Sequence, residues 1–102
     1  MVSPGDGSSG DGAGAWLFQL GTIVATPTAL AALPREDIQY ALGRHVSGDW
    51  GIMSKQDRRA NDLAVAAGTH IVSAYLSSDG RKFWVITEAD RSATTVFLPE
   101  DN

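Results

Sequence analysis

The sequence contains no cysteine, which excludes disulfide bridges, thiolate metal sites and cysteine nucleophiles. It also lacks any apolar run that approaches the ~18 residues of a membrane-spanning helix. Its first basic residue is Arg35, and a secretory signal needs basic residues before its apolar stretch. These absences predict a cytoplasmic protein without a signal peptide and without a membrane partner.

Basic residues are few, because eight Lys and Arg residues stand against twelve Asp and Glu, for a formal net charge of -4. Binding to nucleic acid relies on a basic face that neutralises phosphates. The charge balance provides no such face, although Arg58, Arg59, Arg81 and Lys82 could form a small local patch. A protein partner is therefore favoured over a nucleic acid, and self-association is left open.

The chain is long enough for one small domain, with 102 residues of which 43% are hydrophobic. Residues 1–15 are rich in glycine and serine and contain almost nothing apolar, which predicts a flexible extension. The remaining residues, 16–102, are predicted to form a single α+β domain.

The first half of the domain carries one strand signal and then helix signals. Residues 16–26 are rich in large and β-branched side chains and predict a short strand, with Gly21 as a β-bulge. Two to three helices follow. Their ends are indicated by Thr26, Leu33, Pro34, Gly48, Ser54 and Gly68. In the last helix a stripe of small apolar residues is expected to face its neighbour: Ala60, Leu63, Ala64 and Ala67.

The second half predicts strands at 70–77, 81–87 and 93–99, with a hairpin turn at Asp79-Gly80. The expected fold is a short N-terminal strand, the helices, and a three-stranded antiparallel β-meander. In the middle strand, alternation places Phe83, Val85 and Thr87 on one face and Trp84 and Ile86 on the other. Since both faces are apolar, both should be covered, one by helices and the other by segment 16–24 or a second subunit.

The segment RHVSGDWG, residues 44–51, has two interpretations. In the structural one, Gly48 ends a helix and Trp50 anchors the following loop in the core. In the functional one, His45 is a general base. A triad of Ser47, His45 and Asp49 is not expected, because such close neighbours rarely point at one spot. His45 and His70 lack metal-motif spacing, so no metal and no cofactor is predicted.

The segment WVITEADRSATT, residues 84–95, places Glu88, Asp90 and Arg91 in a loop between two strands. The charged side chains could simply order this loop. The alternative is a grip for an anion or a phosphate made by Arg91, Thr94 and Thr95.

Four segments of the body carry a family resemblance: LGTIVATPTALAAL, GRHVSGDWG, RRANDLAVAAG and SAYLSSDGRKFWVITEADRSATTVFLPED. They resemble a family of small bacterial proteins of unknown function that plasmids and other mobile DNA often carry. Some members carry a label naming a type I restriction enzyme subunit, although nothing in this chain resembles a methyltransferase or nuclease subunit. The resemblance covers residues 18–101, departs at 52–54 and at the PEDN end, and implies a compact α+β domain without a defined activity.

Two functional hypotheses follow. The first is a small accessory or interaction protein encoded by mobile DNA, which binds a macromolecular partner through a set of loop residues: Asp49, Trp50, Glu88, Asp90 and Arg91. The alternative is a metal-independent ribonuclease of the barnase, colicin and RelE-like class. Its catalytic candidates would be His45, Arg81, Lys82, Arg91 and Thr95.

Overall fold

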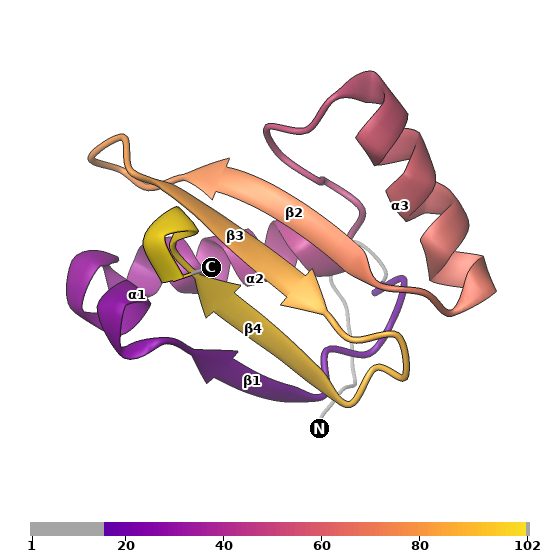
Figure 1. The fold of residues 1–102 in the computed structure, drawn as a ribbon, viewed down its shortest axis with the longest axis horizontal. Coiled ribbons are helices and arrows are strands. Elements are labelled where there is room, and N and C mark those ends of the chain that lie inside the picture. Colours follow the sequence, from indigo (N-terminus) through magenta and orange to yellow (C-terminus); the bar gives the residue numbers. More distant parts are fainter. Residues whose placement is uncertain (1–15, 102) are drawn as a thin grey trace.

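The computed structural model describes residues 16–101, which form an α+β domain of three α-helices and a four-stranded sheet (Figure 1). In chain order the elements are β1 (Thr22–Ala25), α1 (Pro27–Ala32), α2 (Arg35–Val46), α3 (Lys55–Ala67), β2 (Ile71–Leu76), β3 (Lys82–Thr87), β4 (Ala93–Phe97) and the 3-10 helix η2 (Pro99–Asp101). The predicted α+β class is confirmed. The prediction made for residues 1–15 lies outside the described part of the chain. None of the helices described is long and apolar enough to cross a membrane.

The sheet is mixed and has the strand order β1-β4-β3-β2. β2, β3 and β4 form the predicted antiparallel meander, and Gly80 takes the positive φ of +87° that its hairpin needs. The expectation of a three-stranded sheet is nevertheless corrected. β1 adds a fourth strand, parallel to β4, with Thr22 opposite Ala93 and Ala25 opposite Val96.

The N-terminal strand is shorter than the predicted 16–26. Ahead of it, the N–H of Leu17 donates to the carbonyl oxygen of Val46 at 2.9 Å, which ties the segment to the end of α2. Gly21 is not a bulge. Its φ is +65°, and a Cβ there would lie 2.4 Å from backbone atoms of Ser92. The glycine lets the chain pass close to the β3–β4 loop before β1 begins.

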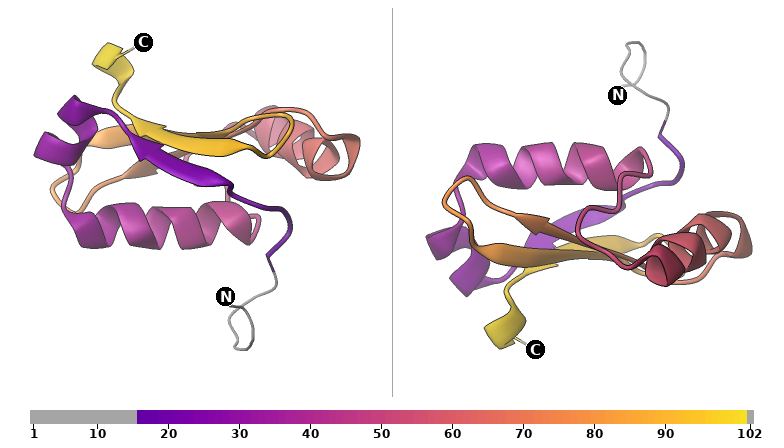
Figure 2. Two further views of the ribbon diagram at one scale, coloured as in Figure 1. Left: turned by 90° about the horizontal axis from the view of Figure 1, so that it is seen from below. Right: turned by 90° about the horizontal axis from the view of Figure 1, so that it is seen from above.

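The sheet has one face packed under α2, here called the inner face (Figure 2). Along β3 the inner positions are Phe83, Val85 and Thr87, and all three are buried. The core beneath α2 consists of two apolar clusters, one around Phe83 and Val96 and one around Trp50 and Ile71. No described helix lies over the opposite, outer face, where only the short η2 turn projects (Figure 2).

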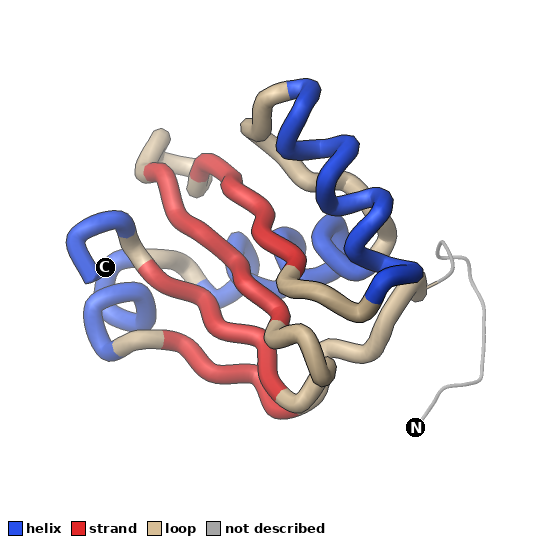
Figure 3. Tube along the Cα trace, turned by 45° about the vertical axis from the view of Figure 1, so that its right-hand side comes forward, coloured by secondary structure: helices blue, strands red, loops and turns tan. Residues whose placement is uncertain are grey.

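α3 lies beside β2, which is the edge strand of the sheet (Figure 3). The side-chain amide of Asn61 donates to the carbonyl of Val72 at 2.7 Å and accepts from its N–H at 3.2 Å. Asn61 therefore occupies the backbone groups that an edge strand would otherwise expose. The predicted apolar stripe is wrong in part. Of its four residues only Ala64 is buried, and Leu63 is 68% exposed.

The loop between α2 and α3 closes the rest of this edge. The N–H of Ala74 donates to the carbonyl of Trp50 at 3.2 Å, and the N–H of Ile52 donates to the carbonyl of Ala74 at 2.7 Å. Between them, Gly51 has φ +76°, and a Cβ there would lie 2.0 Å from the Ala74 carbonyl oxygen. Only glycine permits this close approach, so the DWG sequence docks the loop against β2.

Candidate functional site

The segment RHVSGDWG forms the C-terminal end of α2 and the loop that follows it. The N–H of Asp49 donates to the carbonyl of Arg44 at 2.9 Å, and the hydroxyl of Ser47 donates to the same oxygen at 3.0 Å. Gly48 has φ +92° and lies just beyond the last helical residue, Val46. The interpretation of Gly48 as a helix stop is confirmed.

Asp49 forms a two-point ion pair with Arg44, with distances of 2.7 Å from Nε to Oδ2 and 3.1 Å from Nη2 to Oδ1. This hydrogen-bonded pairing lowers the pKa of Asp49 and raises the pKa of Arg44. The hydroxyl of Tyr75 donates to the backbone carbonyl of Asp49 at 2.6 Å, and burial raises the pKa of this phenol. Asp49 thus holds the loop against both α2 and β2.

His45 is fully buried and bonded at both ring nitrogens. Its Nδ1 lies 2.6 Å from the hydroxyl of Ser73, and its Nε2 lies 2.8 Å from that of Thr87. Thr87 in turn lies 2.7 Å from the hydroxyl of Thr94, which donates to the carbonyl of Leu20 at 2.7 Å. The four side chains form one buried polar network across α2, β2, β3 and β4.

The last bond of this network fixes the direction of the two bonds that Thr87 makes. Because Thr94 donates to a carbonyl, which can only accept, Thr87 must donate to Thr94. Thr87 then has to accept from His45, so Nε2 carries a proton. The Ser73 hydroxyl can donate to a neutral ring at Nδ1 or accept from a charged one, so this bond does not set the charge of the imidazole.

Burial and the nearby positive charge of Arg91 lower the pKa of His45 to about 4. The ring is therefore neutral at neutral pH, and its unprotonated Nδ1 then accepts from the hydroxyl of Ser73. The ring is also 0% exposed, so no substrate reaches it in this structure. His45 serves as an internal crosslink rather than as an accessible base.

Trp50 anchors the loop in the core, as the structural interpretation predicted, and is 3% exposed. Its ring centroid lies 6.3 Å from that of Phe18 and 5.9 Å from that of His45. The indole N–H donates to Oδ1 of Asp62 in α3 at 2.9 Å. Trp50 therefore joins α3, the N-terminal segment and the His45 network.

The guanidinium of Arg91 donates hydrogen bonds to four backbone carbonyl oxygens. Its Nη1 donates to Thr69, Glu88 and Ala89 and its Nη2 to Ala64, at 2.7–3.2 Å. Its guanidinium also lies 5.6 Å from the ring centroid of Phe18. The backbone of Arg91 adopts φ +62°, which turns the β3–β4 loop. The cation thus bonds a carbonyl near the C-terminal end of α3, where positive charge is favourable.

The predicted anion grip is not assembled in this arrangement. Thr94 is buried and bonded within the His45 network, whereas Thr95 lies on the opposite face of the same strand. The two acidic residues of the β3–β4 loop, Glu88 and Asp90, have partners close by. Glu88 lies 3.4 Å from Nε2 of His70, and hydrogen bonds from Ser92 lower the pKa of Asp90.

The five ribonuclease candidates lie in separate places. His45 is enclosed, and the guanidinium of Arg91 is occupied at the β3–β4 end of the sheet. At the β2–β3 hairpin, Arg81 lies 4.0 Å from Glu100, and the Lys82 ammonium lies 4.7 Å from the ring centroid of Trp84. Thr95 is on the outer face of β4. The structure does not bring these residues together on one surface.

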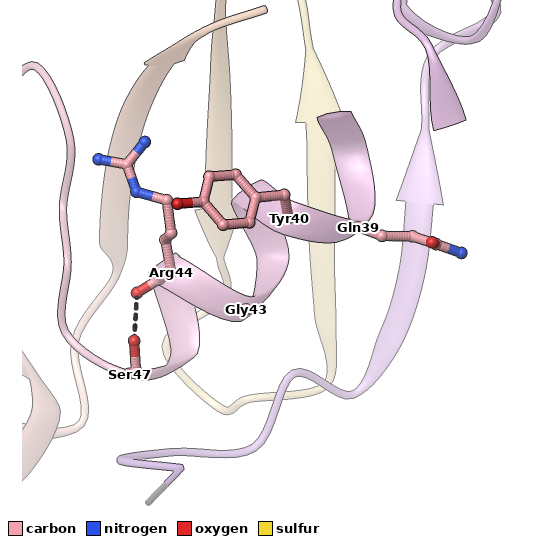
Figure 4. Close-up of a pocket in the computed structure, with 5 residues that line it drawn as sticks. All are labelled: Gln39, Tyr40, Gly43, Arg44 and Ser47. Carbon is pink, nitrogen blue, oxygen red and sulfur yellow. Dashed lines mark hydrogen bonds between the residues drawn. The ribbon is translucent and has the colours of Figure 1, made fainter. Parts of the chain in front are cut away.

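A shallow depression of about 350 Å³ lies on the solvent side of α2 (Figure 4). Its lining residues are Gln39, Tyr40, Gly43, Arg44 and Ser47. Tyr40 is 72% exposed, and the guanidinium of Arg44 lies between the rings of Tyr40 and Tyr75, 5.8 and 4.7 Å from their centroids. Because Arg44 is already paired with Asp49, the depression offers no free charge for a ligand.

Gly43 lies within α2, and a Cβ at this position would meet no atom within 4 Å. Gly43→Ala is expected to raise the free energy of unfolding by roughly 0.5–1 kcal/mol, because alanine restricts the unfolded chain and favours the helix. Urea unfolding measures the difference. Gly48→Ala is the matched control and should destabilise, since Gly48 has φ +92°. Lower stability of Gly43→Ala would contradict the open environment.

The outer face of the sheet carries several apolar side chains that no described α-helix covers. Strand alternation and register place on it Val24 of β1, Thr95 and Phe97 of β4, Trp84 and Ile86 of β3, and Val72 and Leu76 of β2. These seven are partly or largely exposed; Val24 is 45% and Leu76 is 58% exposed. Ala74 of β2, opposite Trp84, shares this face and is buried. Segment 16–24 does not cover them, because Phe18 and Leu20 pack in the core with Val46, on the α2 side.

Comparisons of the chain with protein-family models, with curated proteins and with solved structures found no significant match.

Proposed function

We propose that this chain is a small interaction protein that binds another protein through the outer face of its sheet. The observation that carries the proposal is the unequal cover of the two faces, since α2 packs on the inner face and the outer face has only the three-residue η2 turn at one end. A sheet that is apolar on both faces needs a layer on each. A contiguous exposed apolar patch on a small protein is typical of an interaction site.

The composition of the outer face supports a protein partner. Trp84 and Phe97 are directly opposite each other on β3 and β4, so two aromatic side chains lie together near one end of the face. Aromatic residues are enriched at the centres of protein interfaces, whereas charged residues are placed at their rims. Along β3 and the residue that follows it, the charged side chains on this face, Lys82 and Glu88, lie at the two ends of the row.

The family resemblance supplies a biological setting for the proposal. A small binding protein carried by mobile DNA would act on a host complex or as a regulator, without chemistry of its own. The ribonuclease alternative receives no specific support, because its five candidate residues do not meet on one surface and His45 is fully buried.

Site-specific photo-crosslinking in the producing cells tests the proposal. A benzophenone side chain at Leu76, which is 58% exposed on the outer face, should form a discrete protein adduct. The matched control places the same group at Leu63 of α3, which is 68% exposed and away from this face. Adding Trp84→Ser should remove the Leu76 adduct. Equal adducts at both positions, or none at Leu76, would contradict binding through the outer face.

A further inference from the structure

We infer that the protein bound to the outer face is a second copy of this chain, packed face to face with the two β3 strands antiparallel. The inference rests on the proposed function, because it requires the outer face to be an interface, and it names the partner. It is carried by the order of charged and apolar side chains along β3.

β3 and the residue after it present Lys82, Trp84, Ile86 and Glu88 to the outer face, since alternate residues of a strand share a face. The orientation of Lys82 is fixed by its contact over the Trp84 ring at 4.7 Å. Glu88 continues the ladder, because its N–H donates to the carbonyl of Ala93 at 2.9 Å, and its carboxylate lies 3.4 Å from His70, just before β2. The strand therefore has a cation at one end, a carboxylate at the other and two large apolar side chains between.

This order is self-complementary in only one of two symmetric arrangements. A two-fold axis between the sheets and perpendicular to β3 reverses the second strand, so that Lys82 of each copy faces Glu88 of the other. An axis parallel to β3 would instead place Lys82 against Lys82 and Glu88 against Glu88. Like charges in juxtaposition disfavour that second arrangement.

The apolar side chains fit the same antiparallel arrangement. Trp84 lies beside Phe97, and Ile86 lies beside Thr95, so the face has one row of large and one row of smaller side chains. Reversing the second copy places Trp84 over Ile86 and Phe97 over Thr95. Large side chains then meet smaller ones, as close packing between two sheet faces requires.

Sedimentation equilibrium and light scattering of the full 102-residue chain test this dimer. The wild type is expected to dimerise. Lys82→Glu and Glu88→Lys should each weaken dimerisation at least ~10-fold, because each turns two symmetry-related attractions into repulsions. The double variant restores both pairs with reversed sign and should recover affinity to within about threefold of wild type. Arg58→Glu, on the exposed surface of α3, is the matched control and should have no effect.

The outcomes separate this inference from the proposed function. A wild-type chain that stays monomeric, while Leu76 still crosslinks to a different protein, would overturn the dimer and leave the interaction surface in place. A dimer that the single charge reversals do not weaken, or that the double variant does not restore, would overturn the antiparallel arrangement. Absence of both dimer and crosslink would overturn both. Circular dichroism melting of each variant confirms that the fold is intact, as expected for exposed charges.

Discussion

Trp50→Ala is expected to lower the free energy of unfolding by about 3–5 kcal/mol, the range for truncating a large aromatic side chain in a core. The residue is 3% exposed and contacts the rings of Phe18 and His45. Its loss would leave a cavity where α3, the N-terminal segment and the His45 network meet. The loop that closes the β2 edge also begins at Trp50, so the substitution should loosen that edge as well.

Chemical unfolding followed by far-ultraviolet circular dichroism measures the effect. Trp50→Phe is the matched control, since it keeps an aromatic ring and removes the indole N–H that donates to Asp62. Asp62 is exposed, so water can replace the lost indole N–H as the donor to its carboxylate. Trp50→Phe should therefore lose clearly less stability than Trp50→Ala. A Trp50→Ala protein of native stability would contradict the structural role and would point to a binding role for this side chain.

Local signals in the sequence predicted the helix ends correctly because capping depends on neighbouring residues. Ser54 accepts a hydrogen bond from the N–H of Asp57 at 3.0 Å, and Thr26 accepts from that of Ala29 at 3.1 Å. Gly48 and Gly68 both take positive φ where helices end. None of these features requires knowledge of the tertiary structure.

The sheet edges could not be predicted in the same way, because they depend on contacts between distant segments. The parallel pairing of β1 with β4 joins residues about seventy positions apart, and no turn signal marks it. The prediction that the small apolar residues of α3 face its neighbour is wrong in part, because only Ala64 of the four is buried. In fact Asn61 sets the orientation by bonding the backbone of Val72. A lone Asn within an Ala-rich helix was the available signal.

The role of His45 also depended on register. The sequence left a helix residue and a general base as alternatives, and only the strand pairing places Ser73 and Thr87 at its two nitrogens. A signal was nevertheless present. Ser73, Thr87 and Thr94 occupy inward positions of strands that are otherwise apolar on that side. Three inward hydroxyl groups and one inward histidine predict a shared buried network, since buried polar groups need partners.

The stability of the protein is expected to fall by about 3 kcal/mol as the pH is lowered from 6.5 to 4, because of His45. Its pKa is about 4 in the folded state, against about 6.5 for histidine in an unfolded chain. Above pH 6.5 the ring is neutral in both states, and its contribution is complete. Between these two pH values His45 is protonated in the unfolded state and neutral in the folded state. Each pH unit therefore lowers the free energy of unfolding by about 1.4 kcal/mol. Below pH 4 both states are protonated, and this loss ends.

Urea unfolding at several pH values between 7.5 and 5.5 measures this slope, and it stays above the range in which ordinary aspartates and glutamates titrate, near pH 3.9 and 4.3. His45→Gln should be less stable at pH 7.5 by about 1–2 kcal/mol, since it replaces the ring with a weaker set of hydrogen bonds. Its stability should, however, be nearly independent of pH across this window. Gly43→Ala is the matched control and should retain the wild-type slope, because it adds no titratable group and leaves His45 untouched. A slope that survives in His45→Gln, or a wild type with no slope, would contradict a buried imidazole that stays neutral in the folded protein.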